Sequence, residues 1–159
     1  MKKILALLLT LIMAATVLTG CSDPLYDDFE NYLNVEMVDV NANYVKITEE
    51  AATWSDLDDV NMLAASVNDT LLPLVNDSLE KVNAIQPATD EVKDLKAKYI
   101  KVMDAYKAGF ELIAAAVAED SVDKMNEGNE KITEGITFLN EYNAALEALA
   151  DQVGAEIEY

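Results

Sequence analysis

Apolar residues recur at spacings of three and four along almost the whole chain after residue 23, and this period constrains the fold more than any other feature. The most regular stretch lies within 89–118, where the apolar positions are Val92, Leu95, Tyr99, Val102, Tyr106, Phe110, Ile113 and Val117. This spacing puts the apolar side chains on one face of an α-helix, whereas a half-buried strand would need strict alternation. No stretch competes as a strand, so the sequence predicts an all-α protein.

Turn and cap residues divide this periodic region into four predicted helices. Ser22 or Asp23 can cap a first helix whose first position is Pro24. The clearest turn is Gln86–Thr89, in which Thr89 can cap the third helix, and Gly154 ends the fourth. The predicted helices span 24–53, 56–85, 89–118 and 122–153, and an acidic tail follows over 155–159.

Four helices of about 30 residues with short connections predict an antiparallel, up-down-up-down four-helix bundle over 24–154, about 45 Å long. Pro73 lies inside the second helix, where it removes a backbone hydrogen bond and either kinks the helix or splits it in two. In this topology the start of the first helix, the 86–89 turn and the C-terminus share one end. The connections near 54–56 and 119–121 share the opposite end.

The first 21 residues have the layout of an export signal. Met1-Lys2-Lys3 is positive, the segment 4–17 is apolar apart from two threonines, and small residues precede the only cysteine. The sequence Leu18-Thr19-Gly20-Cys21 resembles the lipobox of bacterial lipoproteins. This resemblance implies a signal peptide over 1–20 that is cleaved before Cys21. It also implies a diacylglycerol on the thiol, with acyl chains such as palmitate, and in some cases a further N-acyl chain.

Two other interpretations of this segment stay open. Cys21 could be a buried core thiol, or 4–20 could be an uncleaved transmembrane helix at the short limit of what spans a bilayer. The lipobox interpretation predicts stable attachment, because two acyl chains hold a protein far better than one. Residues 21–23 then form the lipidated cysteine and a short tether, and the domain lies on the extracytoplasmic face of the cell membrane.

A second resemblance covers residues 87–149. The carrying motifs are Pro87-Ala88-Thr89-Asp90-Glu91-Val92, then Leu95 and Tyr99, then Asn126-Glu127-Gly128-Asn129-Glu130-Lys131. This segment resembles small helical lipoproteins of Gram-positive bacteria. The resemblance implies a location and a fold, and it carries no catalytic residue.

The charge of the chain limits its partners. After residue 20 it has nine lysines and 30 acidic residues, a net charge of −21, with no arginine and no histidine. A chain this acidic repels nucleic acid and anionic head groups and attracts cations or basic proteins. Its single cysteine leaves no thiol for a disulfide, so the fold depends on packing alone.

The residue types present also exclude several chemistries. Without histidine there is no base for an ordinary Ser or Cys nucleophile, no axial haem ligand and no ferritin-like metal site. An EF-hand read from Asp56 has Val60 and Val67 where oxygen ligands are needed. A glycosidase needs only two carboxylates, but none lies in an evident cleft motif. We therefore expect no enzymatic activity and no cofactor other than the lipid on Cys21.

Acidic residues gather at the end of the predicted bundle that is distal to Cys21. This predicted acidic tip contains Trp54, Asp56, Asp58, Asp59, Glu119, Asp120 and Asp123. It could bind a divalent cation or a basic protein, with Trp54 as an aromatic anchor. Alternatively, these acids are ordinary helix caps and Trp54 belongs to the core.

Lysines are concentrated at the end near the anchor. Residues 81–101 carry five lysines against three acids, which predicts a surface that tolerates an anionic membrane. The sequence therefore favours a membrane-anchored, non-enzymatic binding or structural module. One alternative is an accessory lipoprotein that binds a cation or small ligand at the acidic tip or in a crevice opened by Pro73. Another is a carboxylate-dependent hydrolase.

Overall fold

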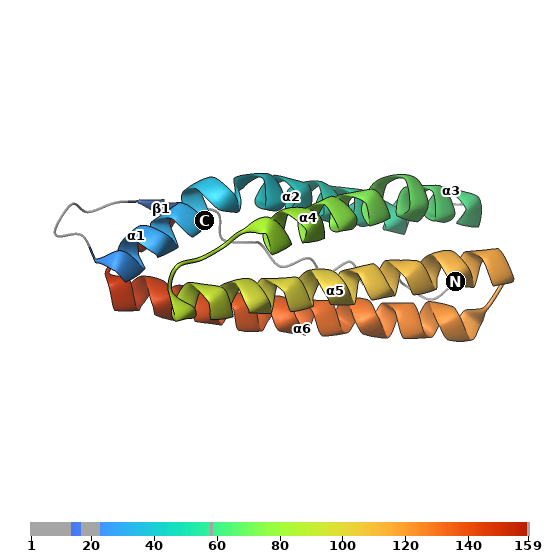
Figure 1. The fold of residues 1–159 in the computed structure, drawn as a ribbon. Helices are drawn as coiled ribbons and strands as arrows, with labels where there is room; N and C mark the ends of the chain where they lie inside the picture. The colour runs from blue at the N-terminus through green and yellow to red at the C-terminus, as the bar shows by residue number, and fades with distance from the viewer. Residues whose placement is uncertain (1–13, 17–22, 58, 159) are drawn as a thin grey trace.

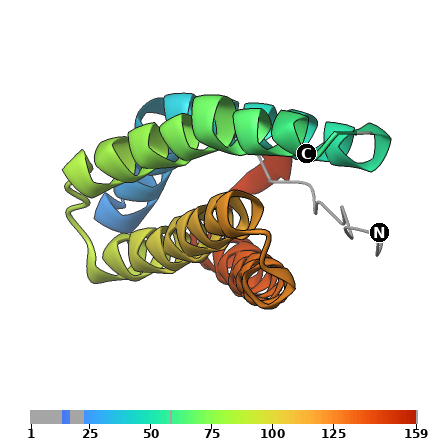
Figure 2. The ribbon, with the colours of Figure 1, turned by 90° about the vertical axis from the view of Figure 1, so that its right-hand side faces the viewer.

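The computed structural model describes residues 14–16, 23–57 and 59–158, with the backbone alone for 14–16, 56 and 158. The chain is mostly helical, as predicted, and its helices run side by side along one long axis (Figure 1). Two layers are visible. One contains α5 and α6, and the other contains the two broken helical runs that precede them (Figure 2).

The first helical run is broken, so the prediction of one continuous helix over 24–53 was wrong. Its parts are α1 (Pro24–Asn31), the π-helix η1 (Tyr32–Glu36), α2 (Val38–Ala52) and the 3-10 helix η2 (Thr53–Asp56). The wide turn closes where the Met37 N–H donates to the Tyr32 carbonyl at 2.9 Å. A π turn contains an extra residue, which keeps Tyr32, Leu33 and Met37 buried together.

The second run is also divided, which answers the question that Pro73 raised. It contains α3 (Val60–Ala65), the π-helix η3 (Ser66–Leu71) and α4 (Leu72–Ala84). Pro73 therefore lies in the first turn of α4, where a missing N–H costs least. The run starts four residues later than the predicted 56–85, and Asp59 caps it.

The two remaining helices are continuous and pack against each other more extensively than any other pair. They are α5 (Asp90–Glu119) and α6 (Val122–Val153), within one residue of the predicted ranges. Three buried glycines line their interface, and they are Gly109, Gly128 and Gly135. In the other layer, α4 packs on both α2 and α5.

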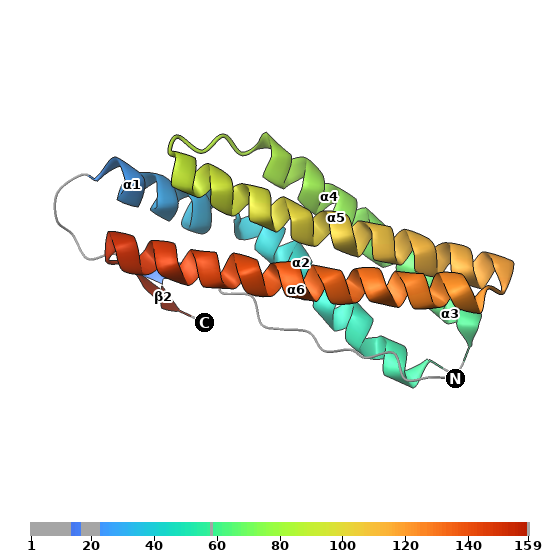
Figure 3. The same ribbon diagram turned by 90° about the horizontal axis from the view of Figure 1, so that it is seen from below.

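The direction of the chain alternates from one run to the next (Figure 3). The start of α1, the connection from α4 to α5 and the end of α6 lie at one end, which we call the anchor end. The connection from η2 to α3 and the turn from α5 to α6 lie at the opposite, distal end. Among the described residues, no helix is both long enough and apolar enough to cross a bilayer.

The C-terminal tail is not a simple frayed end. Residues Glu156–Glu158 form β2, which pairs antiparallel with β1 (Ala14–Thr16), and Ala15 lies opposite Ile157. Because β1 lies inside the predicted signal peptide, we expect this pairing only in the chain before cleavage.

Aromatic side chains fill the space between the two layers. The buried set consists of Phe29, Tyr32, Tyr44, Trp54, Tyr99, Tyr106, Phe110 and Tyr142. Rings contact one another across helices, for example Tyr99 and Tyr142 with centroids 5.2 Å apart. Burial raises the pKa of all five buried tyrosines, because the phenolate would be poorly solvated there.

Candidate functional site

The predicted lipidation site lies just outside the described part of the chain. Leu18, Thr19, Gly20 and Cys21 belong to the segment 17–22, of which nothing structural is described. The described chain resumes at Asp23, whose carboxylate accepts a hydrogen bond from the Leu25 N–H at 3.0 Å and so caps α1. One residue, Ser22, therefore separates Cys21 from the cap of the first helix.

The anchor end is fastened by Asp28 of α1. Its carboxylate accepts hydrogen bonds from the N–H groups of Ala88 and Thr89, at 3.0 and 2.8 Å, and from the Thr89 hydroxyl at 2.5 Å. Thr89 occupies the N-cap position of α5, but its side chain makes no capping hydrogen bond, and its hydroxyl donates to Asp28 instead. Burial opposes ionisation of Asp28, but these hydrogen bonds and Lys93 outweigh it and lower its pKa.

Two lysines near this end bind within the protein. The Lys96 ammonium donates to the carbonyl oxygens of Asn83 and Ile85, at 3.0 and 2.6 Å, and so caps the C-terminus of α4. Lys93 forms an ion pair with Asp90 at 2.8 Å. These lysines stabilise the anchor end as well as contributing positive charge to it.

The acids of the predicted acidic tip act as caps and local partners where the structure describes them. The Asp59 carboxylate accepts from the Asn61 N–H and side-chain amide, both at 2.9 Å. Glu119 forms an ion pair with Lys124 at 2.5 Å. Asp120 is the left-handed C-cap of α5, with φ 51°, and Asp123 lies in the first turn of α6. The side chains of Asp56 and Asp58 lie outside the described part.

Trp54 lies in the core, as the alternative interpretation of the sequence expected, so it is not an exposed aromatic anchor. Its exposed fraction is 6%, and its indole N–H donates to the Ser66 hydroxyl at 2.9 Å. The ring packs edge-on against Phe110, with centroids 5.9 Å apart. Its apolar ring is buried because η2 turns it inward. Among the described side chains, no group of three or more acids or cysteines is placed to hold a metal ion.

A shallow surface groove lies between the two broken runs. It has a volume of about 540 Å³ at its α4 side and about 500 Å³ in an overlapping region nearer α3. The lining residues come from α2–η2 and from the α3–η3–α4 run, and they are Lys46, Glu49, Glu50, Thr53, Leu57, Met62, Ala65, Ser66, Asp69, Thr70, Pro73 and Leu74. We call it the α2–η3 groove.

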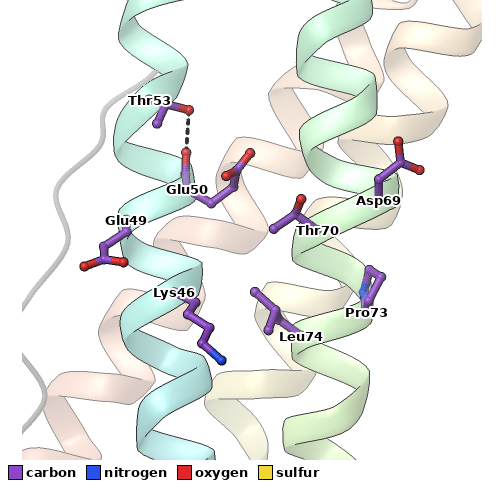
Figure 4. A pocket seen from close by; sticks show the side chains of 8 residues that line it. All are labelled: Lys46, Glu49, Glu50, Thr53, Asp69, Thr70, Pro73 and Leu74. Atoms are coloured by element: carbon purple, nitrogen blue, oxygen red, sulfur yellow. Dashed lines mark hydrogen bonds between the residues drawn. The ribbon is translucent and has the colours of Figure 1, made fainter.

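Side chains of α2 form one side of this groove, and side chains of the η3–α4 run form the other (Figure 4). Thr70 and Leu74 project toward α2, whereas Lys46 and Glu50 reach from α2 toward them. Glu49 points away along the outer side of α2, and Asp69 stands on the far side of the groove. Three carboxylates and one ammonium line the groove, so its net charge is negative.

A polar cluster lies between α2 and α4. The Lys81 ammonium bridges Asp77 and Asp39, at 2.9 and 3.4 Å, and the Asn43 amide donates to Asp77 at 2.5 Å. These contacts tie α2 to α4. The hydrogen bonds from Lys81 and Asn43 lower the pKa of Asp77. The hydrogen bonds that Lys81 donates to Asp77 and Asp39 raise the pKa of the Lys81 ammonium.

Sequence reasoning found this site only in outline. Pro73 does line a groove, as the crevice hypothesis expected. The η3 segment, which contributes Asp69 and Thr70, had no signal in the apolar period. The apolar residues Val67 and Leu71 are four positions apart in the sequence, which is the spacing expected of an α-helix. Nothing in the apolar pattern therefore indicated that this segment is a π-helix.

A comparison with protein-family models gives one match. Residues 1–156 match the family described as EMYY-motif containing lipoprotein. No curated protein and no solved structure gives a significant match. The match spans nearly the whole chain, and the protein therefore belongs to the EMYY-motif containing lipoprotein family.

Proposed function

We propose that this lipoprotein is a non-enzymatic binding module, held by a lipid on Cys21 at the extracytoplasmic face of the membrane. Membership of a lipoprotein family and the lipobox at 18–21 support the anchor. The proposal assigns the α2–η3 groove as the binding surface, and it assigns the aromatic core a purely structural role.

The observation that carries the proposal is the short distance between the lipid site and the first helix. Asp23 caps α1 only two residues after Cys21, and two extended residues reach about 7 Å. Asp28 then binds the start of α5, so the anchor end is rigid and moves as one unit. The bundle should therefore stand close to the bilayer, with its distal end facing outward.

The same geometry makes a partner more plausible than chemistry on a substrate. The groove is lined by threonines, carboxylates and one lysine, and its sequence contains no histidine to activate a hydroxyl. Separate carboxylates on the two sides of the groove offer attraction to a basic partner. The proposal accordingly includes no cofactor beyond the lipid and no nucleic acid partner.

A fractionation experiment tests the anchor. Cys21→Ser should move the protein from the membrane pellet to the soluble fraction and abolish incorporation of labelled palmitate. Ser22→Ala is the matched control and should leave both unchanged. Because cleavage before residue 21 also needs the cysteine, the palmitate label on the wild type decides the test. If the wild-type protein incorporates no labelled palmitate, the lipid anchor is wrong and the segment 4–20 holds the chain instead.

A further inference from the structure

We infer that the α2–η3 groove binds a basic amphipathic helix of about three turns, supplied by a peptide or by a segment of a partner protein. This inference rests on the proposed function, because it names the kind of partner that the binding module takes. Three features of the groove support it: its shape, the placement of its charges and the packing of Ser66 on its η3 side.

Two helical faces run along the sides of the groove. On α2 the lining residues follow the spacing 46, 49, 50 and 53, and on the opposite run they continue from 62 to 74. Positions three and four apart share one helical face, so each wall is a continuous ridge. Twelve residues at 1.5 Å each give a length of roughly 18 Å, which fits about three turns of helix. A trough between two ridges is the geometry in which proteins receive an amphipathic helix.

The chemistry of the groove selects the faces of that helix. Leu57, Ala65 and Leu74 offer apolar contact, and Met62 exposes 55% of its surface at the distal end. Glu50 on the α2 side and Asp69 on the η3 side place carboxylates on the two sides of the groove (Figure 4). A matching helix carries a narrow apolar stripe with a lysine or arginine on each flank. Because the whole domain is acidic, long-range attraction also draws such a helix toward the protein.

The η3 wall of the groove is held in place by contacts with the core. Ser66 lines the groove and accepts the Trp54 N–H, and Trp54 packs against Phe110 of α5. Ordering this wall therefore costs little on binding, which favours affinity.

The test uses the acylated full-length mature lipoprotein in uncharged nanodiscs and a labelled 14-residue peptide of leucine and lysine with a single apolar stripe. The double variant E50Q/D69N should weaken binding at least tenfold in fluorescence anisotropy. The control E130Q/D151N removes two exposed charges from α6, so it lowers the net charge equally, and we expect less than a twofold effect. Ala65→Phe fills the groove without changing charge and should also weaken binding at least tenfold. Circular dichroism melts establish that each variant is folded.

Several outcomes would overturn the inference. Equal weakening by both charge variants, with no effect of Ala65→Phe, would show only diffuse attraction to an acidic protein. Equal affinity for a scrambled peptide of the same composition would exclude recognition of an amphipathic helix. Displacement of the peptide by spermidine at equal concentration would favour a small cation. If peptide binding fails while Cys21→Ser still releases the protein, the partner is wrong and the anchor stands.

Discussion

Gly109 and Gly128 face each other across the α5–α6 interface so closely that a Cβ on either residue would lie 3.0 Å from the carbonyl oxygen of the other. The Cβ of Gly109 would also lie 2.7 Å from the Ile132 side chain, and that of Gly128 would lie 2.8 Å from Ile113. The two long helices therefore approach each other at a point where only glycine fits on both sides.

Gly128→Ala should destabilise the protein by about 1–3 kcal/mol, because the added methyl overpacks a contact that includes rigid backbone. The measurement is the free energy of unfolding in urea. At an exposed helical position the same change stabilises a protein by about 1 kcal/mol. The sign of the change in unfolding free energy therefore distinguishes a close helix contact from an exposed position. Stabilisation by Gly128→Ala would mean that the helices are not in close contact there. Gly154→Ala meets no atom within 4 Å and is the control for backbone strain alone.

Asp28→Asn should lower stability at neutral pH by about 1–2 kcal/mol, because a neutral amide accepts the three hydrogen bonds at the start of α5 less well. Solvent screens this half-buried carboxylate, which keeps the expected effect small. Asp27→Asn, on an exposed neighbour in the same turn, should have little effect.

The contribution of Asp28 should also depend on pH. Its pKa is lower in the folded than in the unfolded state, so its stabilisation is present above the unfolded pKa of about 4 and disappears as pH falls through the folded value. The difference in unfolding free energy between wild type and Asp28→Asn should therefore shrink on acidification. A constant difference between pH 7 and pH 2 would exclude the role of the ionised carboxylate.

Ser66→Ala should destabilise the protein by about 1–3 kcal/mol, because it leaves the buried indole N–H of Trp54 without its acceptor. Trp54 is the only tryptophan, so its emission reports this site directly. In the wild type we expect blue-shifted emission and weak quenching by acrylamide. Ser55→Ala, at an exposed position next to the indole, serves as the control. Strong acrylamide quenching of the folded wild type would place the ring on the surface.

The five buried tyrosines predict a sharp loss of stability in alkali. Burial raises their pKa in the folded state, so the folded chain keeps protons that the unfolded chain releases above about pH 10. The contribution of these tyrosines to the free energy of unfolding is therefore fully present below about pH 10 and is lost as pH rises above it. Absorbance at 295 nm should show most phenolates appearing together with the loss of helical circular dichroism. A smooth titration of all seven tyrosines near pH 10, with the helices intact, would contradict the buried cluster.

The regular parts of the fold were readable from the sequence because local signals there agreed with tertiary packing. The residues of the 89–118 stripe are buried in α5 from Val92 to Ile113, and only the last, Val117, is half-buried. The ends of α6 coincide with the polar break at 119–121 and with Gly154. In each case one helical period extends over eight or nine turns, so no competing pattern arises.

The site was less predictable, for two physical reasons. A π turn changes the number of residues per helical turn without changing which residues are apolar. The apolar pattern of the sequence therefore did not indicate η1 or η3. The sequence left Trp54 open between the surface and the core because acids surround it, and its ring packs against Phe110, which is 56 residues away. The partner of Thr89 was missed for a similar reason, because Asp28 reaches it across 61 positions.

The π turn at Tyr32–Glu36 also sets the angular position of everything beyond it. Each residue turns an α-helix by 100°, so one residue more or fewer in η1 would rotate α2 by over a quarter of a circle relative to α1. With the lipid on Cys21 that we propose, this single turn determines which way Lys46 and Glu50 face around the bundle axis. A relative with one deletion there would keep the same core composition and display a different side to its surroundings.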